Sequence, residues 1–238
     1  RLFTSILLFS FVLLNSFSFS QNNKQILFDS LKTYHYKAIF VEKNGDTLSQ
    51  EKIVLQPTGK VWDAQNTQTL VKEFYFTNDT IFSKFKDPRL KKNQKPKFGK
   101  VIESRTGAIE TDSLLWIHPF RSNQYVYTEI APFPRVKINK LKIGNEWSGG
   151  TTFIMAGWGN FKGHVSSSYI VTGNIKKEFF HQELTDCWVI DASGAHNKLG
   201  KSTLTFLFHK DFGFIEMNYV FYDGTKIQFV LDEVTIKK

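Results

Sequence analysis

Histidine spacing is the first place to look for chemistry, because the chain has six histidines and a single cysteine. Metal sites commonly repeat histidines three to five positions apart, and no two histidines here have that spacing. His181 and Glu183 could point to the same side of a strand, but two ligands make an incomplete site. We therefore expect no bound metal.

Sequence motifs for phosphate binding and nucleophilic catalysis are incomplete. Gly200-Lys201-Ser202 matches the end of a phosphate-binding loop, but Ala195 stands where the first glycine is required. Ser193-Gly194 does not belong to a Gly-x-Ser-x-Gly nucleophile elbow. We predict no catalytic residue and no cofactor. A hydrolase with an unrecognised site remains an alternative, because folds host sites that motifs do not reveal.

A glycine-rich stretch from residue 149 to residue 163 predicts a mobile loop. Apolar side chains alternate with its glycines, and the candidate ligand-binding residues are Phe153, Met155, Trp158 and Phe161. Such a loop could form an adaptable lip over an apolar pocket. The alternative is a plain surface loop.

The N-terminus has the layout of a secretory signal peptide. Arg1 precedes an apolar run over residues 6–14, and Ser18 and Ser20 occupy the small-residue positions before a cleavage point at Gln21. We predict residues 1–20 as the signal and residues 21–238 as one exported domain, periplasmic or extracellular. No second run is long enough to cross a membrane, so we expect no transmembrane segment in the mature chain.

The formal net charge of +9 is concentrated in one segment, residues 86–100. An exported chain makes nucleic acid an improbable partner. The segment could instead contact an anionic partner such as phospholipid headgroups or acidic glycans, and a solvated loop is the alternative. The candidate contacts are Arg89, Lys91, Lys92, Lys95 and Lys97.

The rest of the chain is typical of strands, rich in β-branched and aromatic residues and divided by turn dipeptides. Residues 34–42 and 47–55 flank Asn44-Gly45, which favours a hairpin. Residues 70–76 and 80–86 predict a second hairpin in the same way.

The C-terminal hairpin allows a prediction of register. A three-residue loop, Tyr222-Asp223-Gly224, places Tyr219 opposite Ile227 and Met217 opposite Phe229, which makes one face apolar and the other polar. A two-residue loop would mix polar and apolar residues on both faces. The pattern therefore indicates the longer loop, with Gly224 in a left-handed conformation.

Together these elements predict a mainly β protein. We expect a single antiparallel curved sheet of eight or more strands, forming a barrel or half-barrel, with a short N-terminal helix over residues 21–31. An apolar concave face would need a ligand, a partner or a plug to cover it.

Several motifs carry a family resemblance: Trp116-Ile117-His118-Pro119-Phe120, the run from Tyr127 to Pro134, Asp186-Cys187-Trp188-Val189-Ile190, Phe212-Gly213-Phe214 and Asp223-Gly224. In these motifs the chain resembles an uncharacterised family of secreted bacterial proteins. The order of its strands is also similar to periplasmic lipoprotein-carrier (LolA-like) half-barrels. That resemblance implies an apolar concave sheet that holds acyl chains, and it transfers no functional residue.

The sequence thus leads to two hypotheses. The first is a non-catalytic binding protein whose apolar concave sheet holds a lipid or another hydrophobic ligand. The second is a structural or assembly component of the cell envelope that docks a protein partner.

Overall fold

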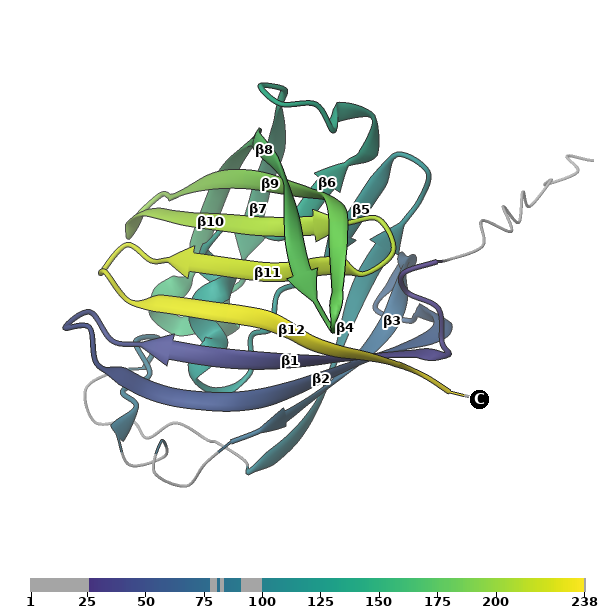
Figure 1. Ribbon diagram of the computed structural model, residues 1–238. Coiled ribbons are helices and arrows are strands. Elements are labelled where there is room, and N and C mark those ends of the chain that lie inside the picture. Colours follow the sequence, from purple (N-terminus) through teal and green to yellow (C-terminus); the bar gives the residue numbers. More distant parts are fainter. Residues whose placement is uncertain (1–25, 78–80, 82–83, 91–99, 238) are drawn as a thin grey trace, which may run out of the picture.

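The computed structural model describes residues 26–77, 81, 84–90 and 100–237, which form a strongly curved sheet around an aromatic core (Figure 1). Twelve strands lie in this part of the chain in the order β6-β5-β4-β3-β2-β1-β12-β11-β10-β9-β8-β7. The strands are β1 (Lys32–Val41), β2 (Thr47–Trp62), β3 (Gln65–Phe76), β4 (Val101–Glu110), β5 (Leu114–Ile117), β6 (Arg135–Lys137), β7 (Glu146–Ile154), β8 (Gly163–Phe179), β9 (Gln182–His196), β10 (Gly200–His209), β11 (Gly213–Val220) and β12 (Lys226–Ile236). The 3₁₀ helices η1 (Asn123–Ile130), η2 (Ile138–Lys140) and η3 (Ala156–Phe161) lie between strands.

The sheet curls until its two end strands, β6 and β7, approach each other. The Arg135 guanidinium on β6 donates to the Gly149 carbonyl on β7 at 2.6 Å, and the Tyr169 hydroxyl donates to the Phe133 carbonyl at 2.7 Å. Right-handed strand twist makes such curling the usual outcome for a long antiparallel sheet. The predicted mainly β, single antiparallel sheet is confirmed, and it is a nearly closed barrel.

The C-terminal hairpin has the predicted register. Met217 pairs with Phe229 and Tyr219 with Ile227, and all four side chains are buried. The Phe221 N–H donates to the Thr225 carbonyl at 2.9 Å, and Gly224 has a φ of +90°. A side chain at this φ would be strained, so the turn needs glycine.

The hairpin from β1 to β2 is likewise as predicted, but the second predicted hairpin is wrong. β3 pairs with β4 instead, and the Phe85 N–H donates to the Ile81 carbonyl at 2.9 Å, as in a helical turn. Ile81 and Phe85 are both buried, and the spacing of four puts them on one face of such a turn. Asn78 and Asp79, where the turn was predicted, lie outside the described residues.

The predicted N-terminal helix is also wrong over its described part, residues 26–31, which form bends and a turn. The Glu110 carboxylate accepts hydrogen bonds from the backbone N–H groups of Ile26, Leu27 and Phe28 at 2.8–3.1 Å. Leu27 and Phe28 are both buried although they are adjacent in sequence. The Glu110 side chain at the end of β4 thus accepts the hydrogen bonds of these N–H groups, so they need no helix.

The concave face of the sheet is covered by residues 118–134, which we call the plug. All eight residues of η1 are buried, and the Phe120 and Tyr125 rings lie 5.0 and 5.4 Å from the Phe229 ring of β12. Tyr127 packs on Phe221 at 5.1 Å. The core is therefore formed between the plug and the sheet.

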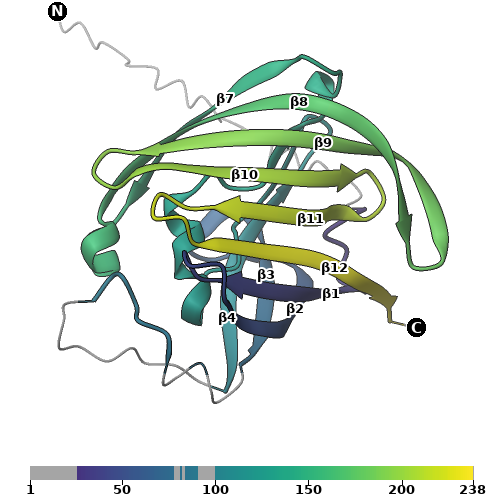
Figure 2. The same ribbon diagram turned by 60° about the vertical axis from the view of Figure 1, so that its left-hand side comes forward.

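The β8–β9 hairpin extends beyond its neighbours and bends over the outer face of the sheet (Figure 2). Lys177 forms an ion pair with Glu216 of β11 at 3.1 Å, and the Phe179 ring lies 5.0 Å from Phe212. Breaks in strand register at residues 172 and 176 accompany this bend, as bulges often do.

Candidate ligand site on the outer face of the sheet

The concave face carries mostly apolar side chains, and residues of the chain itself pack on it. The hollow between Leu27, Tyr36 and Phe214 has a volume of about 10 Å³, too small for any acyl chain. At this point the inner surface of the sheet serves as core.

A network of polar side chains ties the plug to the sheet. The Arg121 guanidinium donates to Glu129 at 3.2 Å and lies 3.0 Å from Nε2 of His118. The Arg121 backbone N–H donates to the Tyr75 hydroxyl at 3.1 Å, and that hydroxyl donates to Glu73 at 2.5 Å. The Arg121 contacts join residues 118–129 to one another and to β3, and the hydrogen bond from Tyr75 to Glu73 continues the network within β3.

Burial shifts the pKa values of two groups in this network, Glu73 and His118. Burial raises the pKa of Glu73 to about 7, although the Tyr75 hydrogen bond and the Arg121 charge act in the opposite direction. Burial and the neighbouring Arg121 charge lower the pKa of His118 to about 3. His118 is therefore neutral, and because a guanidinium can only donate, its Nε2 is the acceptor.

The predicted anionic-contact residue Arg89 lies beside the plug. Its guanidinium forms a two-point ion pair with Asp87, at 2.6 Å for the closest contact, and stacks over the Trp158 ring at 5.2 Å. Arg121 stacks over the same ring at 5.8 Å. The contact of Arg89 with an anionic partner remains a prediction. The four other predicted contacts lie outside the described residues: Lys91, Lys92, Lys95 and Lys97.

The glycine-rich stretch is strand β7 followed by η3, so the predicted loop is wrong. A bulge at Gly149 lets the strand continue, and a Cβ there would lie 2.5 Å from the Tyr169 ring.

The structure places the four predicted lip residues in different environments. Phe153 and Met155 are each 72% exposed, Trp158 is half-buried under the two arginines, and Phe161 is fully buried in the core. None of the four lines the large hollows of the outer face described below. Their role in ligand binding remains a prediction.

An apolar hollow of about 570 Å³ lies on the outer face of β1, β2 and β3. Its floor is formed by Val54, Phe74 and Phe76, and Phe76 is 43% exposed. In the register of β2 and β3, Val54 pairs with Phe74. Lys52 pairs with Phe76, two residues away along the strands. Exposed clusters of large apolar side chains on a protein surface mark binding sites more often than chance.

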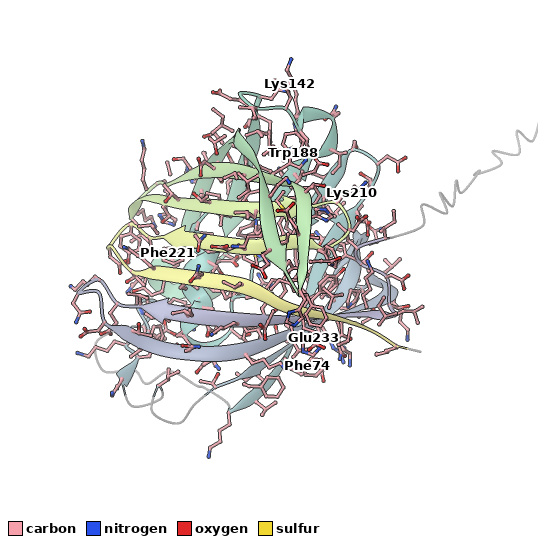
Figure 3. All side chains as sticks on the ribbon, viewed as in Figure 1. Phe74, Lys142, Trp188, Lys210, Phe221 and Glu233 are labelled. Atoms are coloured by element: carbon pink, nitrogen blue, oxygen red, sulfur yellow. The ribbon has the colours of Figure 1, made fainter. Side chains whose placement is uncertain are left out.

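Polar side chains lie at the rim of this apolar floor. Lys52 and His35 line the hollow, and Glu233 of β12 is paired with His35 across the strands. Figure 3 labels Phe74 on β3 and Glu233 on β12 in the lower part of the view, and in the register of the strands three strand spacings separate the two residues. Burial and the Lys52 charge lower the pKa of His35, so near neutral pH Lys52 supplies the positive charge at this rim. An apolar floor with a cation at its rim suits an amphiphile with an anionic head.

The sequence analysis did not predict this hollow, although the aromatic residues of β3 indicate it. Strand alternation puts every second residue of β3 on the core side, so Tyr75 faces inward and its two neighbours face outward. The three consecutive aromatic residues Phe74-Tyr75-Phe76 therefore place two of them on the outer face.

Among the described residues, no helix is long and apolar enough to span a bilayer. In the same part of the chain, no group of three or more histidine, cysteine or carboxylate side chains is arranged to hold a metal ion.

No protein-family model and no curated protein matches the chain. Several solved structures resemble it, and the three described next all have TM-scores below 0.5. A protein with a YmcC-like fold from Bacteroides fragilis has a TM-score of 0.44 and 8% identity, covering 87% of this chain and 96% of the other. The hypothetical lipoprotein YmcC from Escherichia coli has a TM-score of 0.36 and 10% identity, covering 91% and 92%. A beta-barrel-like protein from Brucella abortus has a TM-score of 0.39 and 8% identity, covering 87% and 98%.

Proposed function

We propose that this chain is an exported, non-catalytic binding protein that holds an anionic amphiphile, such as a fatty acid, in the outer hollow of β1–β3. Export follows from the N-terminal pattern, with residues 1–20 as the signal and 21–238 as the mature domain. The observation that carries the proposal is the apolar hollow of about 570 Å³ beside Lys52. The concave face, filled by the plug, is not used.

The site would bind through two complementary contacts. The acyl chain would lie on Val54, Phe74 and Phe76, where each buried methylene contributes about 0.8 kcal/mol. The anionic head would meet Lys52 at the rim. A ligand that lacks either the tail or the negative charge should bind more weakly.

Exchange of both Phe74 and Phe76 for serine should weaken binding of a dansyl-labelled undecanoic acid by about tenfold or more, because the apolar floor is removed. Fluorescence titration of the mature protein, purified without detergent, measures the dissociation constant. Lys52→Ala should weaken binding of the acid but leave the corresponding alcohol nearly unaffected.

The matched control is the double variant Phe153→Ser and Met155→Ser, which removes exposed apolar side chains at the end of β7. It should bind the probe as the wild type does. Equal losses in both double variants would show non-specific adhesion to apolar surface, and the proposed site would be wrong.

A second function, docking of an envelope protein, is favoured by the edge of β7. Among the described strands the end strand β7 pairs with another strand on one side only, although Arg135 of β6 contacts its Gly149 carbonyl, and Phe153 and Met155 are exposed at its end. Unpaired strand edges are templates for an added strand from a partner. The occupant would be an extended peptide with apolar side chains at alternate positions.

A photo-crosslinking amino acid in place of Phe153 should capture one partner at a fixed stoichiometry when a periplasmic extract is irradiated. Irradiation at high salt should capture the same partner. The same group in place of Phe76 serves as the control position on β3. Capture of the same proteins from both positions, or loss of capture at high salt, would contradict docking on the β7 edge.

A further inference from the structure

A row of four hydroxyl side chains crosses the outer face of β7 to β10. The register pairs Ser148 with Ser168, Ser168 with Ser193, and Ser193 with Thr203. Neighbouring strands lie about 4.8 Å apart, so the row extends over roughly 14 Å. These four residues are called the hydroxyl row below. Figure 2 shows β7 to β10 running side by side across the top of the sheet.

The hydroxyl row lines a hollow of about 600 Å³, the volume of a typical small-molecule site. A second row beside it consists of Glu146, Ile170, Asp191 and Thr205, which are paired across the same four strands. The Thr205 hydroxyl donates to the Asp191 carboxylate at 2.5 Å and so fixes it in place. The two outward-facing rows therefore combine hydroxyls and carboxylates around one apolar side chain, that of Ile170.

The chemistry of this lining excludes some ligands. None of the residues that line the hollow is a lysine or an arginine, and two carboxylates are present, so anions are disfavoured. Glu146 and Asp191 lie on the two strands that flank β8, about 10 Å apart, and among the described residues no group of three or more histidine, cysteine or carboxylate side chains is arranged to hold a metal ion. The site suits a neutral ligand with many hydroxyl groups.

We infer that this hollow binds a neutral oligosaccharide. Serine and threonine hydroxyls both donate and accept, which matches sugar hydroxyls, and carboxylates accept hydrogen bonds from them. The hydroxyl row is longer than a single sugar ring, so it fits a short chain of sugars. This site lies on different strands from the proposed amphiphile site, on β7–β10 and not on β1–β3, and it does not depend on it.

Isothermal titration calorimetry of the mature protein with maltotriose, cellotriose and tri-N-acetylchitotriose tests the inference, with trigalacturonate as the anionic comparison. At least one neutral trisaccharide should bind, and trigalacturonate should not. The double variant Ser168→Val and Ser193→Val should weaken that binding by about tenfold or more, because it removes the central hydroxyls. Valine favours strands, so the fold should be retained.

The matched control is Ser166→Val, on the same strand two residues from Ser168 and outside the lining of the hollow. It should bind as the wild type does. Three results would overturn the inference: no binding of any neutral trisaccharide, binding of trigalacturonate alone, or unchanged binding in the double variant. Thermal melting of all variants separates loss of the site from loss of the fold.

Discussion

Phe229→Ala should lower the free energy of unfolding by about 3–5 kcal/mol, as expected for a fully buried phenylalanine that leaves a cavity. Phe229 is 0% exposed and packs against both Phe120 and Tyr125 of the plug. Its removal should loosen the plug from the sheet. Urea denaturation followed by circular dichroism measures the change.

Phe153→Ala is the matched control, because Phe153 is 72% exposed. It should change the free energy of unfolding by no more than about 0.5 kcal/mol. If the two substitutions cost the same, the plug is not packed on the concave face, and the inner face would again be a candidate for ligand binding.

Hairpins were predictable from sequence where alternation and turn chemistry agree. The register of the last hairpin follows from the apolar set Met217, Tyr219, Ile227 and Phe229 and from the need for glycine at position 224. Both observations are local. The curled antiparallel sheet follows from many such hairpins in succession.

The plug could not be predicted, because its residues resemble a surface loop. It contains prolines and polar residues such as Gln124, which is 0% exposed. The Gln124 side-chain amide donates to Glu51 at 2.6 Å and to Ser49 at 3.2 Å, both on β2. Only partners distant in sequence make this burial favourable, since an unpaired buried amide would be costly.

The outer hollows were missed for a related reason. Assigning a face to Phe74 or Ser168 requires the strand register, and the hydroxyl row appears only when four strands are aligned. The predicted lip failed to appear as a loop because Gly149 and Gly150 form a bulge within β7. Glycine-rich sequence is compatible with both structures.

The two proposed sites both lie on the outer face of the sheet. In a half-barrel with an empty concave face, the inner surface would be the first candidate for an apolar ligand. Here the plug turns that surface into a protein core, and its polar network holds the plug in place. The stability of this network should therefore respond to pH, and Glu73 is the group that dominates the response.

The free energy of unfolding of Glu73→Gln, taken relative to that of the wild type, should increase by about 3 kcal/mol as the pH rises from 4.5 to 8. The pKa of Glu73 is about 7 in the folded protein, against 4.5 for an ordinary glutamate. Between these values the folded state binds more protons than the unfolded state, so the stability of the wild type falls with rising pH. A shift of this size corresponds to about 3 kcal/mol.

Glutamine mimics the neutral acid and does not ionise, so the variant lacks this loss. His118 acts in the opposite direction, because its pKa of about 3 makes stability rise between pH 3 and 6.5. That contribution is common to both proteins and cancels in their difference. Urea denaturation at pH 4.5, 6 and 8 gives the difference directly, and the exposed Glu178→Gln is the control. A constant difference between Glu73→Gln and the wild type across this range would mean that Glu73 is already ionised within the network, and that Arg121 outweighs the effect of burial.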